Sequence, residues 1–151
     1  MCVGDICRRD VVTIAPDASL ADAARVMREM HVGMLVVVEP GADGADRMVQ
    51  GVLTDRDIVV TVIGRGAEPK DLKVLDVMTR DPHLAVQGQS VATALRMMHA
   101  YGIHRVPVVG ARSELLGVLS IDDVLEVMAD QLSAISGAIR WEQSRERVMR
   151  P

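Results

Sequence analysis

The segment GVLTDRD, residues 51–57, returns as GVLSIDD at residues 117–123. Each copy is typical of a β-strand that passes into the first turn of a helix capped by Thr or Ser. Upstream, the match continues 71 residues apart, where Val37-Val38 corresponds to Val108-Val109. The chain therefore carries one unit twice. Two copies of a unit too small to close its own core are expected to pack with pseudo-twofold symmetry, leaving paired clefts between them.

Each copy predicts the order strand, helix, strand, strand, helix, so the fold class is α/β (α+β) with two tandem βαββα units. The predicted strands are residues 11–14, 33–39 and 49–53 in the first copy, and 105–109 and 115–119 in the second. Pro107 lies inside its strand, which predicts an edge or a bulge there.

The helices are predicted from their caps and their apolar spacing. Ser19 and Ser90 are expected to cap the middle helices, and the closing helices should begin at Thr54 and Ser120. The apolar residues expected to face the core on the closing helices are Ile58, Val59, Val62 and Ile63 in the first copy, and Val124, Leu125 and Met128 in the second.

These patterns divide the chain into a first repeat (1–66), a linker (67–73), a second repeat (74–131) and a helical tail (132–151). The tail is rich in arginine, at Arg140, Arg145, Arg147 and Arg150. Two interpretations of the tail stay open: a solvated extension, or a helix that packs on a second subunit.

The composition favours one compact globular domain with an aliphatic core. The 151 residues are 49% hydrophobic, with a net charge of −4, no Phe and ten Met. Mixed charges argue against a nucleic-acid surface, and no apolar run is long enough for a bilayer. No secretory signal is visible, so Cys2 and Cys7 are expected to be reduced thiols of a cytoplasmic protein.

The duplicated unit resembles the CBS (cystathionine-β-synthase) domain pair, or Bateman module. The resemblance rests on Gly-hydrophobic-hydrophobic-Thr/Ser-x-x-Asp at 51–57 and 117–123, and on the segments 33–37 and 104–108. It implies binding of adenine nucleotides or related adenosyl ligands in clefts shared by the two halves, usually to regulate an attached or partner protein.

The Thr54-x-x-Asp57 motif has two interpretations. Its spacing is close to a helix capping box, which needs no ligand. Its recurrence at a glycine-containing strand-to-helix junction also places an anion-attracting helix N-terminus there. An Asp in the first turn can accept ribose hydroxyls, and the Thr or Ser hydroxyl can donate to a phosphate.

The resemblance assigns candidate ligand-binding residues to each cleft. The first cleft would be formed by Val52, Thr54, Arg56 and Asp57 with Leu84, Ile103, His104 and Arg105. The mirror cleft would be formed by Val118, Ser120 and Asp123 with Thr13, Val32, Gly33 and Met34. Arginine is a strong two-pronged phosphate donor. Because Met34 and Asp122 replace Arg105 and Arg56, the first cleft is expected to prefer AMP, ADP or ATP. The mirror cleft is expected to bind weakly, to take a less charged ligand, or to stay empty.

No enzymatic motif is apparent. The four histidines lack metal-ligand spacing, and neither a phosphate-binding loop nor a nucleophile elbow is present. The predicted function is therefore a regulatory sensor of adenine nucleotides, not an enzyme, with no required cofactor. It is expected to act as a homodimer through an unidentified partner protein. The alternatives are a structural or oligomerisation module with vestigial clefts, binding of NAD or S-adenosylmethionine instead, and nucleic-acid binding through the arginine-rich tail.

Overall fold

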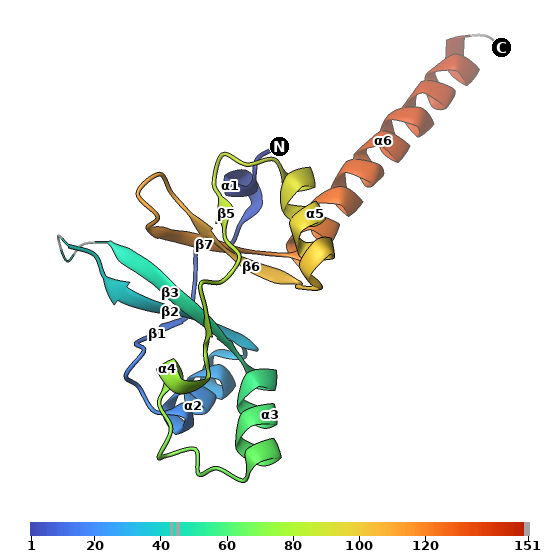
Figure 1. The fold of residues 1–151 in the computed structure, drawn as a ribbon. Coiled ribbons are helices and arrows are strands. Elements are labelled where there is room, and N and C mark those ends of the chain that lie inside the picture. Colours follow the sequence, from blue (N-terminus) through green and yellow to red (C-terminus); the bar gives the residue numbers. More distant parts are fainter. Residues whose placement is uncertain (43, 45, 150–151) are drawn as a thin grey trace.

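Two small sheets form the centre of the molecule (Figure 1). This computed structural model describes residues 1–42, 44 and 46–149. The elements in chain order are α1 (Val3–Ile6), β1 (Thr13–Ile14), α2 (Leu20–Met30), β2 (Met34–Pro40), β3 (Arg47–Thr54), α3 (Asp55–Arg65), α4 (Val74–Val77), β4 (Thr79–Arg80), β5 (Ala85–Val86), α5 (Val91–Tyr101), β6 (Arg105–Val109), β7 (Leu115–Ser120) and α6 (Ile121–Met149). The strand orders are β1-β2-β3-β4 and β5-β6-β7.

The two sheets repeat the same pairing. In each, the first strand runs parallel to the second, and the second runs antiparallel to the third. Both antiparallel ladders shift register at matching positions, between Val37 and Val38 and between Val108 and Val109. The predicted βαββα order and mixed α/β class are therefore confirmed.

Pro107 lies in β6, which has a neighbour on each side. The partner strand β5 pairs only with Val108 and Val109, so β5 does not pair with Pro107. The bulge is one residue further on. The strand β6 is therefore not an edge strand. Proline, which has no N–H to donate, is tolerated at position 107 because β5 does not pair with this residue.

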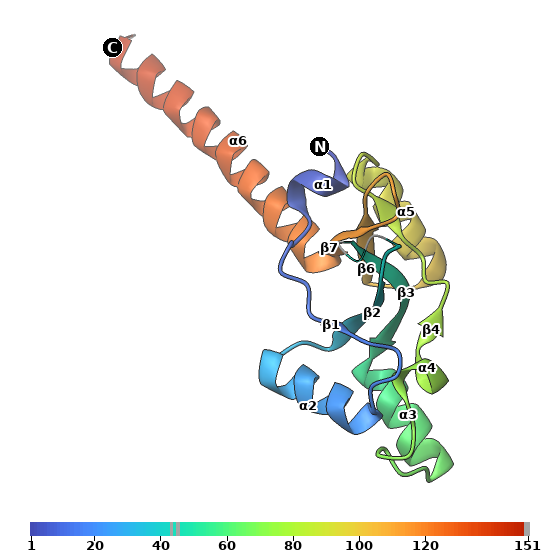
Figure 2. The ribbon, with the colours of Figure 1, turned by 90° about the vertical axis from the view of Figure 1, so that its left-hand side faces the viewer.

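The halves exchange two short helices, α1 and α4 (Figures 1 and 2). Val3 of α1 is fully buried in the core of the second half, and Val74 of α4 is fully buried in the core of the first. The Gly4 amide donates to the Gln87 carbonyl at 2.9 Å, and the Val74 amide donates to the Ala18 carbonyl at 2.8 Å. Each half thus completes its core with a segment that precedes the other half in sequence.

The core is aliphatic, as the composition predicts, with methionine filling it in both halves. The buried residues of the first cluster are Leu20, Ala23, Met27, Leu35, Val37, Leu53 and Val74. Those of the second are Val3, Cys7, Ala85, Val91, Ala94, Met98, Val106, Val108, Leu119 and Val124.

The closing helices contact the core along a narrower stripe than predicted. Ile58 and Val62 pack against the first core, but Val59 and Ile63 are 54% and 76% exposed. On α6, Val124 is buried, whereas Leu125 and Met128 are 58% and 48% exposed. Adjacent helical positions point about 100° apart, so only one i, i+4 stripe of α3 can reach the sheet. The inward assignment of Val59, Ile63, Leu125 and Met128 was wrong.

The helix α6 continues without a break through the predicted tail and projects away from the rest of the molecule (Figures 1 and 2). It contains Gly137, so that glycine does not end the helix. Leu132, Ile135 and Ile139 are more than half exposed along it. The side chain of Arg147 and the whole of Arg150 lie outside the described residues. Within the described ranges, no helix combines the length and the apolar character that crossing a bilayer requires.

Candidate functional site

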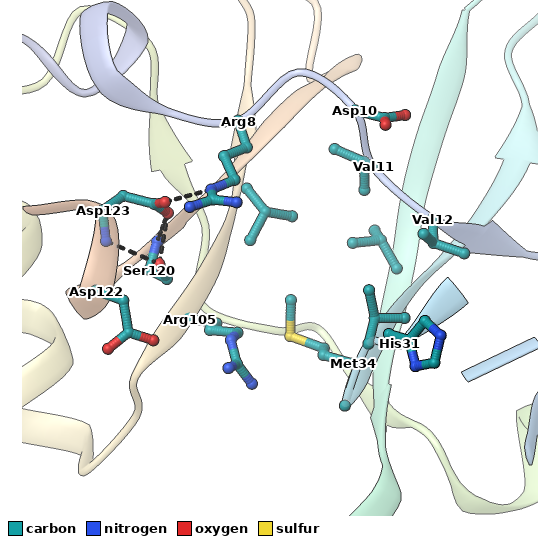
Figure 3. Close-up of a pocket in the computed structure, with 14 residues that line it drawn as sticks. Arg8, Asp10, Val11, Val12, His31, Met34, Arg105, Ser120, Asp122 and Asp123 are labelled. Atoms are coloured by element: carbon teal, nitrogen blue, oxygen red, sulfur yellow. Dashed lines mark hydrogen bonds and ion pairs between the residues drawn. The ribbon is translucent and has the colours of Figure 1, made fainter. Parts of the chain in front are cut away.

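Two pockets open between the halves of the chain. The first, which we call the Asp57 cleft, has a volume of about 520 Å³ and is lined by Gly33, Met34, Val52, Thr54, Asp55, Arg56, Asp57, Thr79, Asp81, Pro82, His83, Gly102, Ile103, His104, Arg105 and Pro107. The second, the Asp123 cleft, has a volume of about 270 Å³ and is lined by Arg8, Asp10, Val11, Val12, His31, Val32, Gly33, Met34, Val36, Arg105, Val118, Ser120, Asp122 and Asp123 (Figure 3). Small-ligand pockets typically measure ~300–1,000 Å³, so both clefts are near or within that range.

The linings of the two clefts are related by the sequence repeat. Asp123, Ser120 and Val118 occupy the places of Asp57, Thr54 and Val52. Met34 and Arg105 are each other's counterparts, and both line both clefts. The clefts are therefore pseudo-twofold equivalents that meet at Met34 and Arg105.

The structure brings most of the predicted residues together in these pockets. The exceptions among the described residues are Thr13 and Leu84, which line neither. The preceding residues form the walls instead: Val11 and Val12 in one cleft, and Pro82 and His83 in the other. Thr13 already belongs to β1, so its backbone is paired with β2.

The helix caps predicted at both clefts are present. The Asp57 Oδ2 atom accepts from the Thr54 amide at 2.9 Å and from the Thr54 hydroxyl at 2.6 Å. In return, the Asp57 amide donates to Thr54 Oγ1 at 3.2 Å. The capping interpretation is therefore confirmed. It also commits the hydroxyl proton of Thr54 to Asp57, so the predicted donation to a phosphate would require the cap to open.

The cap leaves the second oxygen of Asp57 uncommitted. No other described residue donates a hydrogen bond to Oδ1, and the side chain is only partly buried at the cleft. A ligand hydroxyl can therefore donate to this oxygen without breaking the cap.

The Asp123 cleft has the same cap but a different neighbour. Asp123 Oδ2 accepts from the Ser120 amide at 2.9 Å and from its hydroxyl at 2.5 Å. Asp123 Oδ1 accepts from Arg8 Nε at 2.5 Å (Figure 3). Burial alone would raise the pKa of Asp123, but hydrogen bonds from Ser120 and Arg8 hold that pKa below its ordinary value. The hydrogen bond to Asp123 also raises the pKa of Arg8.

The two clefts are lined by equal numbers of aspartates and arginines. The Asp57 cleft is lined by Asp55, Asp57, Asp81, Arg56 and Arg105. The Asp123 cleft is lined by Asp10, Asp122, Asp123, Arg8 and Arg105. The replacement of Arg105 by Met34 in the repeat therefore does not leave the mirror cleft without arginine.

The arginines of the Asp123 cleft come from two places in the chain. The exchanged N-terminal segment delivers Arg8 to the Asp123 cleft, and Arg105 borders both pockets. The repeat alignment pairs Arg8 with Thr79, so only the packing of the N-terminus against the second half reveals it. Other lining residues that the sequence did not suggest are Asp10, His31 and Asp81, all of which lie a few residues before a strand of the sheets.

Within the described parts of the chain, no three His, Cys, Asp or Glu side chains converge in a way that could hold a metal ion. The groups in the clefts are instead suited to binding. Each combines a helix N-terminus, a first-turn carboxylate, two guanidinium groups and aliphatic walls.

The family model for the CBS domain matches the chain twice, at residues 3–64 and 74–130. An uncharacterised protein of Methanopyrus kandleri is 31% identical over 125 residues, which cover 83% of this chain and 61% of that protein. An inosine-5′-monophosphate dehydrogenase of Methanocaldococcus jannaschii is 33% identical over 118 residues, but these cover 78% of this chain and only 22% of the enzyme.

A solved CBS domain pair, in complex with 5-methylthioadenosine and S-adenosyl-L-methionine, superposes with a TM-score of 0.73. The alignment covers 87% of this chain and 98% of that one, at 21% identity. At that identity, the likeness shows the fold alone.

Proposed function

Because the chain belongs to the CBS domain family, we propose that it is a regulatory module that binds an adenine nucleotide between its halves. The observation that carries this proposal is the Asp57 cleft, where a first-turn carboxylate keeps one oxygen uncommitted beside two arginines. AMP, ADP and ATP all offer the complementary groups: a ribose diol and at least one phosphate.

Each part of the nucleotide has a matching group in the Asp57 cleft. The ribose hydroxyls would donate to Asp57 Oδ1. The phosphates would accept from Arg56 and Arg105, which can bind them as two-pronged, charge-assisted donors. The adenine would lie against the aliphatic side chains of Val52 and Ile103.

Binding in this cleft would regulate by bridging the halves. Asp57 comes from the first half and Arg105 from the second, so a bound nucleotide ties the two together. A ligand shifts a conformational equilibrium only by its difference in affinity between the states, typically ~1–3 kcal/mol for allosteric coupling. The output would go through a partner protein. The proposal places the module in the cytoplasm, where free thiols such as Cys2 and Cys7 stay reduced.

Isothermal titration calorimetry with AMP, ADP, ATP, NAD and S-adenosylmethionine tests the proposal. Wild-type protein should bind at least one adenine nucleotide, and Asp57→Ala should weaken that binding about tenfold or more, because the ribose loses a charged acceptor. Absence of binding to every compound would favour a structural module with vestigial clefts.

The matched control is Asp22→Ala. Asp22 also belongs to a helix cap: its amide donates to Ser19 Oγ at 3.0 Å, and its Oδ2 accepts from the Ser19 hydroxyl at 2.8 Å. It differs from Asp57 in being paired with Arg25, and it lines neither cleft. Both substitutions remove a first-turn carboxylate, so each should destabilise the fold by about 1 kcal/mol or less. Only Asp57→Ala should change the affinity. Equal affinity in the two variants would leave Asp57 with capping as its sole role.

We also propose that α6 pairs with α6 of a second copy. Its apolar residues follow alternating steps of four and three, at Ile121, Leu125, Met128, Leu132, Ile135 and Ile139. This is the heptad spacing of a coiled-coil seam. The part from Leu125 onward is exposed along a helix that projects alone (Figure 2). A self-complementary seam of this kind is satisfied by another copy of the same helix.

The charges along α6 favour an antiparallel pair. Its first turns carry Asp122, Glu126 and Asp130 and no basic residue, whereas residues 140–150 contain four arginines and two glutamates. A parallel pair would place the acidic turns side by side, where like charges repel. An antiparallel pair places each acidic stretch beside the arginines of the other copy.

A further inference from the structure

We propose that Arg8 is an internal competitor for the Asp123 cleft: its guanidinium occupies the carboxylate oxygen that a ribose would need. The inference rests on the proposed nucleotide-binding function and goes beyond it, because it assigns the difference between two otherwise equivalent clefts to one side chain.

Both carboxylate oxygens of Asp123 already accept hydrogen bonds from protein groups. Oδ2 holds the cap through the amide and hydroxyl of Ser120, and Oδ1 accepts from Arg8 Nε at 2.5 Å. The Asp123 side chain is 7% exposed, and the guanidinium of Arg8 lies against its carboxylate (Figure 3). Asp57, the counterpart, has the same cap and no arginine on its second oxygen in the described chain. A ligand can reach Asp123 Oδ1 only after Arg8 moves.

The backbone of Arg8 is fixed while its side chain is not. The Arg8 amide donates to the Val118 carbonyl, and the Val118 amide donates to the Arg8 carbonyl, both at 2.9 Å. The side chain is 69% exposed. Glu126 Oε2 lies 3.9 Å from an Arg8 terminal nitrogen and is itself exposed, which gives the guanidinium a second carboxylate to turn to. Arg8 can therefore leave Asp123 by side-chain rotation alone.

The consequence is selection by ligand charge. A ligand without phosphate, such as adenosine, must break the Arg8–Asp123 pair and offers Arg8 no new acceptor. A phosphate offers a replacement anion to the displaced guanidinium, which binds phosphate as readily as carboxylate. The Asp123 cleft thus discriminates against uncharged adenosyl ligands. The Asp57 cleft, where Thr79 stands at the position of Arg8, does not discriminate in this way.

The test is calorimetric titration of the full chain with adenosine and with AMP. The substitution Arg8→Thr gives the Asp123 cleft the residue type that the Asp57 cleft has at Thr79. In the Asp57→Ala background, Arg8→Thr should raise the affinity for adenosine about tenfold or more, as expected for removing a charge-assisted competitor. It should raise the affinity for AMP less. Arg8→Thr alone should bind two adenosine molecules with similar affinities, a readout that does not depend on the stability of Asp57→Ala.

The matched control is Arg9→Thr, which removes the same charge one residue away. Arg9 contacts the Gly4 and Leu116 carbonyls and lines neither cleft, so it should leave both affinities unchanged. A gain in AMP affinity as large as the gain in adenosine affinity would overturn the proposal, because Arg8 would then not discriminate by the charge of the ligand. Unchanged adenosine binding would overturn it as well.

The two proposals fail separately. If wild-type protein binds AMP in the Asp57 cleft but Arg8→Thr does not open the other, only the role of Arg8 is refuted. If neither the wild type nor any variant binds an adenosyl ligand, the proposed function is refuted, and the role of Arg8 with it.

Discussion

Gly51 and Gly117 show why the repeated motif contains glycine at its start. A Cβ atom at Gly51 would lie 2.7 Å from the Thr79 carbonyl oxygen, and one at Gly117 would lie 2.7 Å from the Arg8 carbonyl oxygen. In both places a segment that precedes the opposite half lies beside the strand in antiparallel pairing. The glycine therefore makes room for the backbone of the exchanged segment.

We expect Gly117→Ala to destabilise the protein by ~1–3 kcal/mol, because the new methyl group overlaps backbone atoms that cannot move without breaking the Arg8–Val118 pairing. Urea unfolding followed by circular dichroism would measure the change. Gly137→Ala is the control, since a Cβ there meets no described atom within 4 Å. That substitution should stabilise α6 by up to ~1 kcal/mol through helix propensity. A Gly117→Ala variant as stable as the wild type would contradict the close approach.

The Arg8–Asp123 pair makes a pH-dependent contribution to stability. Asp123 has a folded-state pKa below its ordinary value of 3.8. A carboxylate with a lowered pKa stabilises the fold above that ordinary value, and this contribution is lost as the pH falls through the lower, folded-state pKa. Wild-type protein should therefore be more stable than Arg8→Thr at neutral pH.

The expected difference in unfolding free energy between wild type and Arg8→Thr is present above pH 3.8 and is lost as the pH falls through the lowered, folded-state pKa of Asp123. Urea unfolding of both proteins across this pH range is the measurement. A difference that persists unchanged in acid would mean that Arg8 stabilises the fold by packing and not by its charge.

At the scale of helices and strands, the long elements could be predicted from the sequence and the short ones could not. The caps at Ser19, Thr54 and Ser90 and the apolar spacing behind them specify α2, α3 and α5 closely. The helices α1 and α4 are four residues each, too short to show a period. Their burial in the opposite half depends on tertiary packing, which a local pattern does not contain.

The inward faces of α3 and α6 were overestimated for a related reason. An apolar side chain that stays exposed has the same sequence signature as one that packs on the core. Val59 and Leu125 were assigned to the core on that signature, and both are exposed. Hydrophobicity alone cannot separate exposed from buried positions.

The candidate site was predictable to the extent that it follows the repeat. Asp57, Asp123 and their cap partners lie in the motif itself, so the duplication identifies them. Arg8 pairs with a carboxylate 115 residues away in sequence, and its repeat counterpart is a threonine. Nothing in the local sequence indicates that pair. It is also what changes the predicted electrostatics of the second cleft.

For the whole molecule, an antiparallel α6 pair predicts both an oligomeric state and a geometry. Sedimentation equilibrium should give a dimer for the wild type and a monomer for Leu132→Glu, which places a charge in the centre of the seam. Ser133→Glu adds the same charge one position away, outside the apolar stripe, and should stay dimeric.

Spin labels at Glu142 would measure the direction of pairing. In an antiparallel pair centred on Leu132, the two labelled positions lie roughly 30 Å apart along the helices, at 1.5 Å per residue. In a parallel pair they would lie side by side. A short distance in a dimeric protein would refute the antiparallel arrangement while keeping the seam.

Because α1 and α4 pack on the opposite halves, neither sequence repeat contains all the residues of its own hydrophobic core. Cutting the polypeptide between the repeats would separate Val74 from the socket beside Leu20, and Val3 from the socket beside Leu119. Each fragment would then lack one buried side chain, and the apolar residues around that position would be exposed to water.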